Sequence, residues 1–200
     1  HPHCETATAM RTHSQAMMAT RMRSTILFEH KIIFTGPVGA GKTTLIKAFS
    51  GSEPVLTEVR ASDEVSQLKE STTVAMDYGS VILDEETKVH LYGTPGQKRF
   101  DFMWDILSRG SMGLAILINA KAPKPFDDLR FYLDAFKGLI VDQDLPVVVG
   151  INQVNKDQPD PSRAEFKAVA EEFRLGIPVL MIDAREEKDV RRMVMTLLFS

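Results

Sequence analysis

Short apolar segments recur along the chain between stretches that are richer in polar residues. Two of them, Gly113–Ile118 and Val147–Ile151, contain only apolar residues, which is typical of strands buried on both faces. Thr73–Leu83 and Thr87–Tyr92 are separated only by Asp84–Glu86, which predicts a hairpin. The pattern predicts strands at Ile26–Thr35, Thr73–Leu83, Thr87–Tyr92, Gly113–Ile118, Val147–Ile151 and Pro178–Ile182.

Helical periodicity fills most of the intervals between these strands. Ser162 with Glu165 three residues later is a capping box, which predicts the start of a helix. Another helix is predicted by an apolar stripe at positions i, i+3, i+4 and i+7, formed by Leu129, Tyr132, Leu133 and Phe136. Further helices are predicted up to Gly51, over Lys98–Arg109, and over a closing segment whose inward-facing residues are Val190, Met193, Val194, Leu197 and Leu198.

The alternation of strands and helices predicts one α/β domain over residues 26–200. Parallel strands joined by crossover helices form a sheet with helices on both faces. We therefore predict a three-layer αβα sandwich with a mostly parallel six-stranded sheet, in which the hairpin places one antiparallel strand at an edge. Residues 52–72 are polar and aperiodic, so they are predicted to form a long loop.

Residues 1–25 differ from the rest of the chain because they show no sustained apolar periodicity. Three arginines against one glutamate give this segment an excess of positive charge. It lacks the continuous apolar centre of a secretory signal. We expect a flexible tail or residues foreign to the native chain, with a basic docking arm as the alternative.

Composition and charge narrow the classes of function. The 200-residue chain has a formal net charge of −3, and its lysines and arginines are dispersed, which argues against a nucleic-acid groove. The single cysteine, Cys4, excludes a disulfide scaffold and fits a cytoplasmic protein. No apolar run reaches the ~18 residues of a membrane-spanning helix, and neither end carries a lipidation motif, so direct membrane insertion is not expected.

The segment Gly36–Thr43 matches the phosphate-binding pattern G-x-x-x-x-G-K-[ST] at every specified position, between a predicted strand and a predicted helix. Its glycines let successive backbone N–H groups turn toward phosphate oxygens, and the helix N-terminus adds a positive dipole. Lys42 is predicted to contact the β- and γ-phosphates, and the Thr43 hydroxyl to ligate Mg²⁺. The predicted phosphate-binding residues are Gly36, Val38, Gly39, Ala40, Gly41, Lys42, Thr43 and Thr44.

Further motifs follow this loop at Thr73, Thr94-Pro95-Gly96-Gln97, Asn152-Gln153-Val154-Asn155 and Asp183-Ala184-Arg185. In this order behind a complete phosphate loop, they make residues 26–200 resemble the small Ras-like GTPases. The resemblance implies that Thr73 is the switch I threonine, which contacts Mg²⁺ and the γ-phosphate. It also implies that the Gly96 N–H senses the γ-phosphate and that Gln97 orients the attacking water. Lys42, Thr73 and Gln97 are thus the predicted catalytic residues.

The same resemblance implies that two segments at strand ends bind the guanine base of GTP or GDP. Asn152–Asn155 stands where the family has its Asn-Lys-x-Asp motif. Asp183–Arg185 resembles the Ser-Ala-Lys motif, in which the alanine N–H meets guanine O6. The run Gly93–Gln97 with Arg99-Phe100 and Trp104 is most similar to the bacterial MglA-like branch, which regulates polarity and surface motility. That branch implies roadblock/LC7-type proteins as partners, besides other protein regulators or effectors.

The sequence departs from the family pattern in three places. Gly93 stands where the family has an aspartate that holds Mg²⁺ through water, so metal binding should be weaker but not lost. Val38 takes a loop position that is often glycine, and its side chain would crowd an incoming arginine finger. Asn155 and Gln153 replace the aspartate and lysine that read the base, and a mispaired amide costs about 1–3 kcal/mol. Asp157 is the alternative acceptor.

These observations leave three hypotheses about function. The leading one is a guanine-nucleotide-binding molecular switch that slowly hydrolyses GTP with Mg²⁺. The departures favour an alternative, a nucleotide-bound interaction module (a pseudo-GTPase) with relaxed base specificity and little turnover. A phosphotransferase such as a nucleoside kinase fits less well, because it leaves the Thr94–Gln97 turn without a task.

Overall fold

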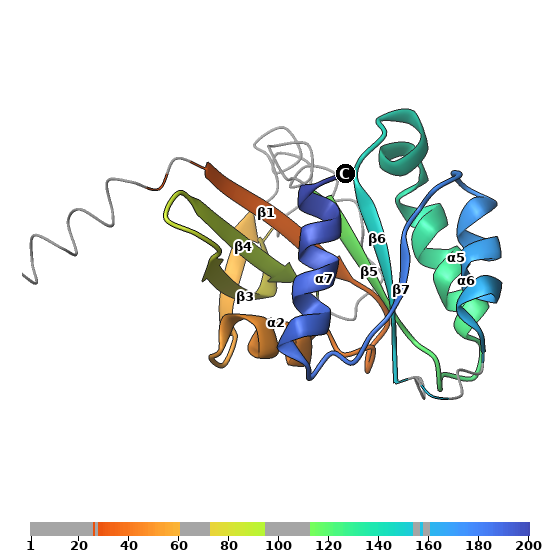
Figure 1. The fold of residues 1–200 in the computed structure, drawn as a ribbon, viewed down its shortest axis with the longest axis horizontal. Coiled ribbons are helices and arrows are strands. Elements are labelled where there is room, and N and C mark those ends of the chain that lie inside the picture. The colour runs from red at the N-terminus through yellow and green to blue at the C-terminus, as the bar shows by residue number, and fades with distance from the viewer. Residues whose placement is uncertain (1–25, 27, 61–72, 95–112, 154–156, 158–160) are drawn as a thin grey trace, which may run out of the picture.

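The strands of the protein form one mixed sheet with helices on both faces (Figure 1). The computed structural model describes residues 26, 28–60, 73–94, 113–153, 157 and 161–200. Within them, seven strands lie in the order β2-β3-β4-β1-β5-β6-β7. Their bounds are Phe28–Thr35 for β1, Val55–Arg60 for β2, Thr73–Ile82 for β3, Thr87–Gly93 for β4, Gly113–Asn119 for β5, Val147–Asn152 for β6 and Val179–Met181 for β7.

The helices form the two outer layers of the fold (Figure 1). Helices α2 (Lys42–Ser50) and α7 (Glu187–Leu198) pack on one face of the sheet. Helices α5 (Pro125–Ala135) and α6 (Arg163–Glu171) pack on the other face, and a π-helical turn, η1 (Gly138–Asp142), follows α5. The predicted three-layer αβα fold is thus confirmed.

Strand β5 shows why its sequence is apolar throughout. Leu114 and Ile116 point into the core beneath α5 and α6, whereas Ala115 and Leu117 point into the core beneath α2 and α7. All four side chains are fully buried. A central strand covered on both faces has no solvent-facing position, so the alternation of polar and apolar residues disappears.

The direction of the strands matches the predicted mostly parallel sheet. Strands β4, β1, β5, β6 and β7 pair in parallel with one another. Strand β3 is antiparallel to both of its neighbours, β4 and β2. The antiparallel part of the sheet therefore lies at one edge, as the hairpin at Asp84–Glu86 predicted.

The predicted count of six strands was wrong, because part of the predicted loop 52–72 is strand β2. Among the described residues, strand β2 pairs with β3 only, with Val55 opposite Tyr78, and it forms the edge of the sheet. Val55 and Leu56 are 63% and 69% exposed. An edge strand held by backbone hydrogen bonds, with little burial, shows no apolar period, so the sequence pattern gave no sign of it.

Other predicted elements are found within a few residues of their expected bounds. The capping box at the start of α6 is present, since the Ser162 hydroxyl accepts from Glu165 N and the Glu165 carboxylate accepts from Ser162 N. The helix predicted over Lys98–Arg109 and the tail 1–25 lie outside the described residues. Among the residues that the structure does describe, no helix combines the length and the apolar character needed to span a bilayer.

Candidate functional site

The phosphate loop connects the carboxyl end of β1 to helix α2, at the centre of the sheet edge where the parallel strands end. Gly36 and Gly41 have positive φ angles of 150° and 105°. A Cβ on Gly36 would lie 2.2 Å from the Leu117 carbonyl oxygen, and one on Gly41 would lie 2.5 Å from Asn152 Nδ2. The loop is pressed against β5 and the end of β6, which leaves room for glycine alone at these positions.

The Lys42 side chain folds back over this loop. Its ammonium group donates to the Gly36 carbonyl at 2.5 Å and to the Pro37 carbonyl at 2.9 Å, and the residue is 9% exposed. Burial lowers the pKa of Lys42 to about 8, although the nearby Asp77 carboxylate raises it in part. The group therefore still carries a charge at neutral pH. A poorly hydrated cation beside a helix N-terminus that has no acidic residue in its first turn favours an anion.

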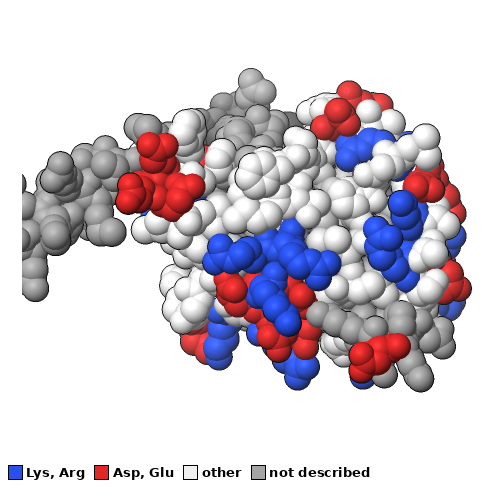
Figure 2. Space-filling view, in the orientation of Figure 1, with Lys and Arg blue, Asp and Glu red and all other residues white. Residues whose placement is uncertain are grey.

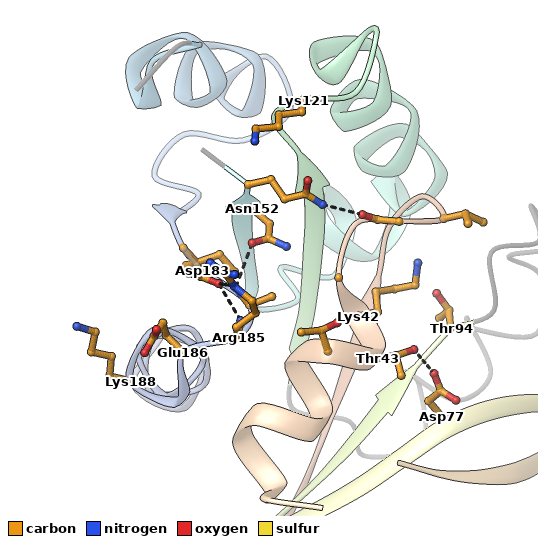
Figure 3. Close-up of a pocket in the computed structure, with 17 residues that line it drawn as sticks. Lys42, Thr43, Asp77, Thr94, Lys121, Asn152, Asp183, Arg185, Glu186 and Lys188 are labelled. Carbon is orange, nitrogen blue, oxygen red and sulfur yellow. Dashed lines mark hydrogen bonds and ion pairs between the residues drawn. The ribbon is translucent and has the colours of Figure 1, made fainter. Parts of the chain in front are cut away.

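A cavity of about 980 Å³ opens beside the loop (Figure 3). Lys42, Thr43, Asp77 and Thr94 lie at one end of it, and Asn152 lies toward the other. The predicted binding residues that line it are Val38, Gly39, Gly41, Lys42, Thr43, Thr44, Asn152, Gln153, Asp183, Ala184 and Arg185. Three segments far apart in the sequence thus meet around one space large enough for a nucleotide.

Asn152 ties these segments together from a buried position with 6% exposure. Its Nδ2 donates to the Ala40 carbonyl at 2.9 Å, and its Oδ1 accepts from Ala184 N at 3.0 Å. The phosphate loop is therefore held to both segments that the sequence assigned to the base. The Ala184 amide, which the resemblance assigns to guanine O6, donates here to a side chain of the protein itself.

Replacing Asn152 by alanine is expected to destabilise the fold by about 2–4 kcal/mol, because a buried donor and acceptor would both lose their partner. Gln153→Ala is the matched control, since the exposed Gln153 side chain makes one longer bond, at 3.3 Å, to the Gly39 carbonyl. We expect that control to change stability by less than about 0.5 kcal/mol. Urea unfolding of both variants measures the difference, and equal effects would contradict the proposed role of Asn152.

The turn after β7 is stabilised by its own charged side chains. The Asp183 carboxylate accepts from the Arg185 backbone N at 3.0 Å and from the Arg185 guanidinium at 2.8 and 3.0 Å. The Asp183 backbone N donates in turn to Asp189 on α7 at 2.8 Å. These bonds fix the position of the Ala184 N–H relative to Asn152 (Figure 3).

Several predicted site residues do not have a described side chain. Thr73 is the first residue of β3, but its side chain lies outside the described part of the chain. Gly96, Gln97 and Asn155 lie outside the described residues altogether. Their predicted roles in hydrolysis and base recognition stay predictions. Asp157, the alternative acceptor, is described and exposed.

Sequence reasoning missed Asp77 as a residue of this site. The Thr43 hydroxyl donates to Asp77 Oδ2 at 2.6 Å, and Asp77 lines the cavity. Asp77 stands in strand β3, 34 residues after Thr43. The available signal was a lone carboxylate within an otherwise uncharged strand, which alone does not distinguish a site residue from an exposed one.

Comparison with known proteins decides the family. Residues 34–197 match a family described as "Conserved hypothetical ATP binding protein". The chain belongs to this family. The match begins in β1, just before the phosphate loop, and ends in α7, so it includes the whole cavity.

Relatives of this member of the ATP-binding family include small GTPases. The Ras-related protein RABE1d of Arabidopsis thaliana is 25% identical over 190 residues, which are 91% of this chain and 80% of the relative. The GTP-binding protein ypt2 of Schizosaccharomyces pombe is 25% identical over 170 residues, 84% of this chain and 78% of the relative. An uncharacterized protein of Methanocaldococcus jannaschii is 31% identical over 93 residues, 46% of this chain and 52% of the relative. The family match and the two Ras-type matches support the small Ras-like GTPase superfamily.

The cavity of this ATP-binding family member offers oxygen atoms of the kind that suit Mg²⁺. The Thr43 hydroxyl and the Asp77 carboxylate lie side by side at the end of the cavity next to Lys42. Over the ranges that the structure describes, no three His, Cys, Asp or Glu side chains gather into a metal site. Mg²⁺ carried by a nucleotide usually has few protein ligands, all of them oxygen atoms. Its remaining ligands come from water and phosphates. The residues therefore fit that ion.

The surface around α7 carries charges of both signs (Figure 2). Arg191 pairs with Glu187 at 2.6 Å, and Arg192 pairs with Asp189 at 3.4 Å. Figure 2 shows basic and acidic groups next to each other in this region and not as a patch of one sign. Paired charges of this kind create little field at a distance.

Proposed function

We propose that this protein is a nucleotide-binding molecular switch that holds GTP with Mg²⁺ in the cavity beside Gly36–Thr43 and hydrolyses it slowly. The observation that carries the proposal is the folded-back Lys42, which is held over a glycine-lined loop at the start of a helix. Residues 26–200 would act as one nucleotide-binding domain. Residues 1–25 would be a tail outside it.

In this proposal each end of the cavity has its own task. Lys42 leaves the loop carbonyls and pairs with the β- and γ-phosphates, while backbone N–H groups of the loop bind the remaining phosphate oxygens. Bound Mg²⁺ would supply positive charge where negative charge develops on the phosphates. Thr73 and Gly96 would order their segments when the γ-phosphate is present, and Gln97 would orient the attacking water. Loss of the γ-phosphate would release both segments.

Replacing Gln97 by alanine is expected to slow phosphate release by about 100-fold, since orientation of the nucleophile is lost. Gln143→Ala is the control, because it is the same substitution at an exposed position away from the cavity, at the end of η1. Phosphate release under single-turnover conditions, with the variants loaded to the same extent, is the measurement. A Gln97 variant as fast as its parent would remove this residue from the mechanism.

Base specificity needs its own measurement, because the family description names ATP whereas the relative ypt2 is named a GTP-binding protein. Among GTP, ATP, XTP and ITP, we expect GTP to compete best for a fluorescent nucleotide, because residues 26–200 resemble the small GTPases; XTP competing better than GTP would mean that the Asn155 amide mispairs with the guanine 2-amino group. Competition by the four nucleotides in the presence of Mg²⁺ gives the order directly. If ATP competes best, the base bound in the cavity is adenine and not guanine. If all four nucleotides compete equally, the result favours the alternative function described next.

The alternative function is a nucleotide-bound interaction module with little turnover. Two observations favour it. Val38 stands 79% exposed at the mouth of the cavity, and the Ala184 amide is engaged with Asn152. An exposed branched side chain there obstructs a partner's arginine, and an engaged amide is a poorer reader of guanine O6. Tight nucleotide binding without phosphate release, even with candidate activators, would identify this alternative.

The finer assignment to the MglA-like branch rests on the run Gly93–Gln97, of which Gly93 and Thr94 are described. Under it, a roadblock/LC7-type protein would bind the triphosphate form. Size-exclusion chromatography with such a protein, using the chain loaded with GDP or with a non-hydrolysable GTP analogue, tests the idea. A complex in the analogue-loaded state supports it, whereas no complex in either state contradicts it.

A further inference from the structure

Gly93 and Asp77 are direct neighbours on adjacent antiparallel strands at the phosphate end of the cavity. A Cβ built on Gly93 would lie 3.4 Å from the Asp77 Cβ, so side chains at the two positions occupy the same face of the sheet. The cross-strand pair thus has one carboxylate, carried by β3 and not by β4. In Figure 3 the Asp77 side chain points toward Thr43.

Packing beneath the loop leaves little room for a side chain at position 93 of β4. A Cβ on Gly93 would lie 2.9 Å from Cδ1 of Ile46, a fully buried residue of α2. That distance is closer than carbon atoms normally approach, so a larger residue at 93 would require Ile46 to shift. The side chain at position 77 instead reaches Thr43, to which it is hydrogen-bonded.

The hydrogen bond from Thr43 to Asp77 leaves the hydroxyl ready for a cation. A threonine hydroxyl has one proton and two lone pairs. At 2.6 Å, Asp77 Oδ2 accepts the proton, so the lone pairs of Oγ1 turn away from Asp77. A carboxylate that accepts from a metal-binding group also raises the basicity of that group and fixes its orientation.

We propose that Asp77 is the positioning carboxylate of a Mg²⁺ site at this end of the cavity. Its cross-strand neighbour Gly93 has no side chain that could serve there. The inference rests on the proposed function, since the ion would arrive with the nucleotide. Asp77 orients the Thr43 hydroxyl toward the ion and places a negative charge beside it. Without the ion, the same charge lies next to the phosphates and repels them.

The two effects have opposite signs, and this makes the Asp77→Asn variant informative. With Mg²⁺ present, the variant should bind GDP or GTP more weakly than the parent. In EDTA it should bind more tightly, because the repulsive charge is gone. The ratio of Kd in EDTA to Kd in Mg²⁺ is expected to fall about 10-fold or more. A residue that served only to hold the fold together would weaken binding in both buffers.

Fluorescent-nucleotide titrations of the full chain, in 5–10 mM Mg²⁺ or in EDTA (roughly saturating and metal-free conditions), measure this ratio. Asp134→Asn is the matched control, because it removes the same charge from an exposed position on α5. Its ratio should equal that of the parent. An Asp77→Asn ratio equal to the parent's would overturn the proposal.

A second experiment moves the carboxylate to another position instead of only removing it. Asp77→Gly combined with Gly93→Asp moves the carboxylate back to β4, and Ile46→Val removes the Cδ1 atom that would crowd it. The double variant Asp77→Gly with Ile46→Val should have a lower ratio of Kd in EDTA to Kd in Mg²⁺ than the parent. The triple variant should recover at least about half of that loss, measured as the logarithm of the ratio. No recovery in a folded triple variant would count against a carboxylate role.

Failure of this inference is distinguishable from failure of the proposed function. If the parent binds nucleotide and its affinity depends on Mg²⁺, but Asp77→Asn leaves that dependence unchanged, only the inference is wrong. If the parent binds no nucleotide in either buffer, the proposed function and the inference fall together. Thermal melting of each variant without nucleotide shows whether it is folded.

Discussion

Replacing Lys42 by alanine is expected to lower nucleotide affinity by at least about 100-fold, which corresponds to about 2.7 kcal/mol. Its ammonium group is the charged donor of the loop, and it is held within the cavity wall by the Gly36 and Pro37 carbonyls. Charge-assisted bonds to phosphate from a poorly hydrated position are stronger than those formed at an open surface. Titration with a fluorescent GDP in Mg²⁺ measures the loss.

Lys47→Ala is the control for this experiment, because Lys47 lies on the same helix, one and a half turns farther along. Its side chain is 57% exposed and pairs with Glu53 at the surface. An exposed pair of this kind contributes little, so we expect the affinity to change less than about twofold. If Lys42→Ala binds as tightly as Lys47→Ala, the folded-back lysine is not a phosphate ligand, and the proposed function loses its main support.

Replacing Gly36 by alanine is expected to destabilise the protein by about 3 kcal/mol or more. The added Cβ would lie 2.2 Å from the Leu117 carbonyl oxygen. That oxygen belongs to the backbone of β5, which is paired on both sides at the centre of the sheet. The backbone cannot move away without breaking these pairs. Urea or thermal unfolding of the variant without nucleotide is the measurement.

Gly39→Ala separates the effect of space from that of backbone conformation. Gly39 also has a positive φ, 81°, but a Cβ built on it meets no atom within 4 Å. We expect about 1–2 kcal/mol of destabilisation there, from conformation alone. Equal losses for the two variants would mean that the contact with β5 contributes nothing, and the loop would have to be less tightly packed than described.

Nucleotide binding has to compete with hydrogen bonds within the site. Lys42 satisfies its charge on loop carbonyls, and Ala184 N satisfies its donor on Asn152. Phosphate and base would have to replace or share these internal partners. Nucleotide binding is therefore an exchange of hydrogen bonds, and its net free energy is smaller than the number of new contacts suggests.

The sequence by itself determined the features that depend on neighbours along the chain. The all-apolar runs of β5 and β6, the capping box of α6 and the phosphate loop at Gly36–Thr43 were each readable from spacing. Such patterns are local, because strand burial, helix capping and loop curvature depend on residues a few positions apart. They were sufficient for the fold class and for the loop residues that line one end of the cavity.

Only the tertiary structure decided the features that depend on distant partners. Strand β2 pairs with β3, although its Val55 and Leu56 side chains are largely exposed. Asn152 is 112 residues from Ala40, and Asp77 is 34 residues from Thr43, yet each pair is joined by a hydrogen bond. No spacing along the chain encodes these contacts, because sheet order places the two residues together. The sequence showed that a carboxylate was missing at Gly93, and the register of β3 on β4 supplied the one at Asp77.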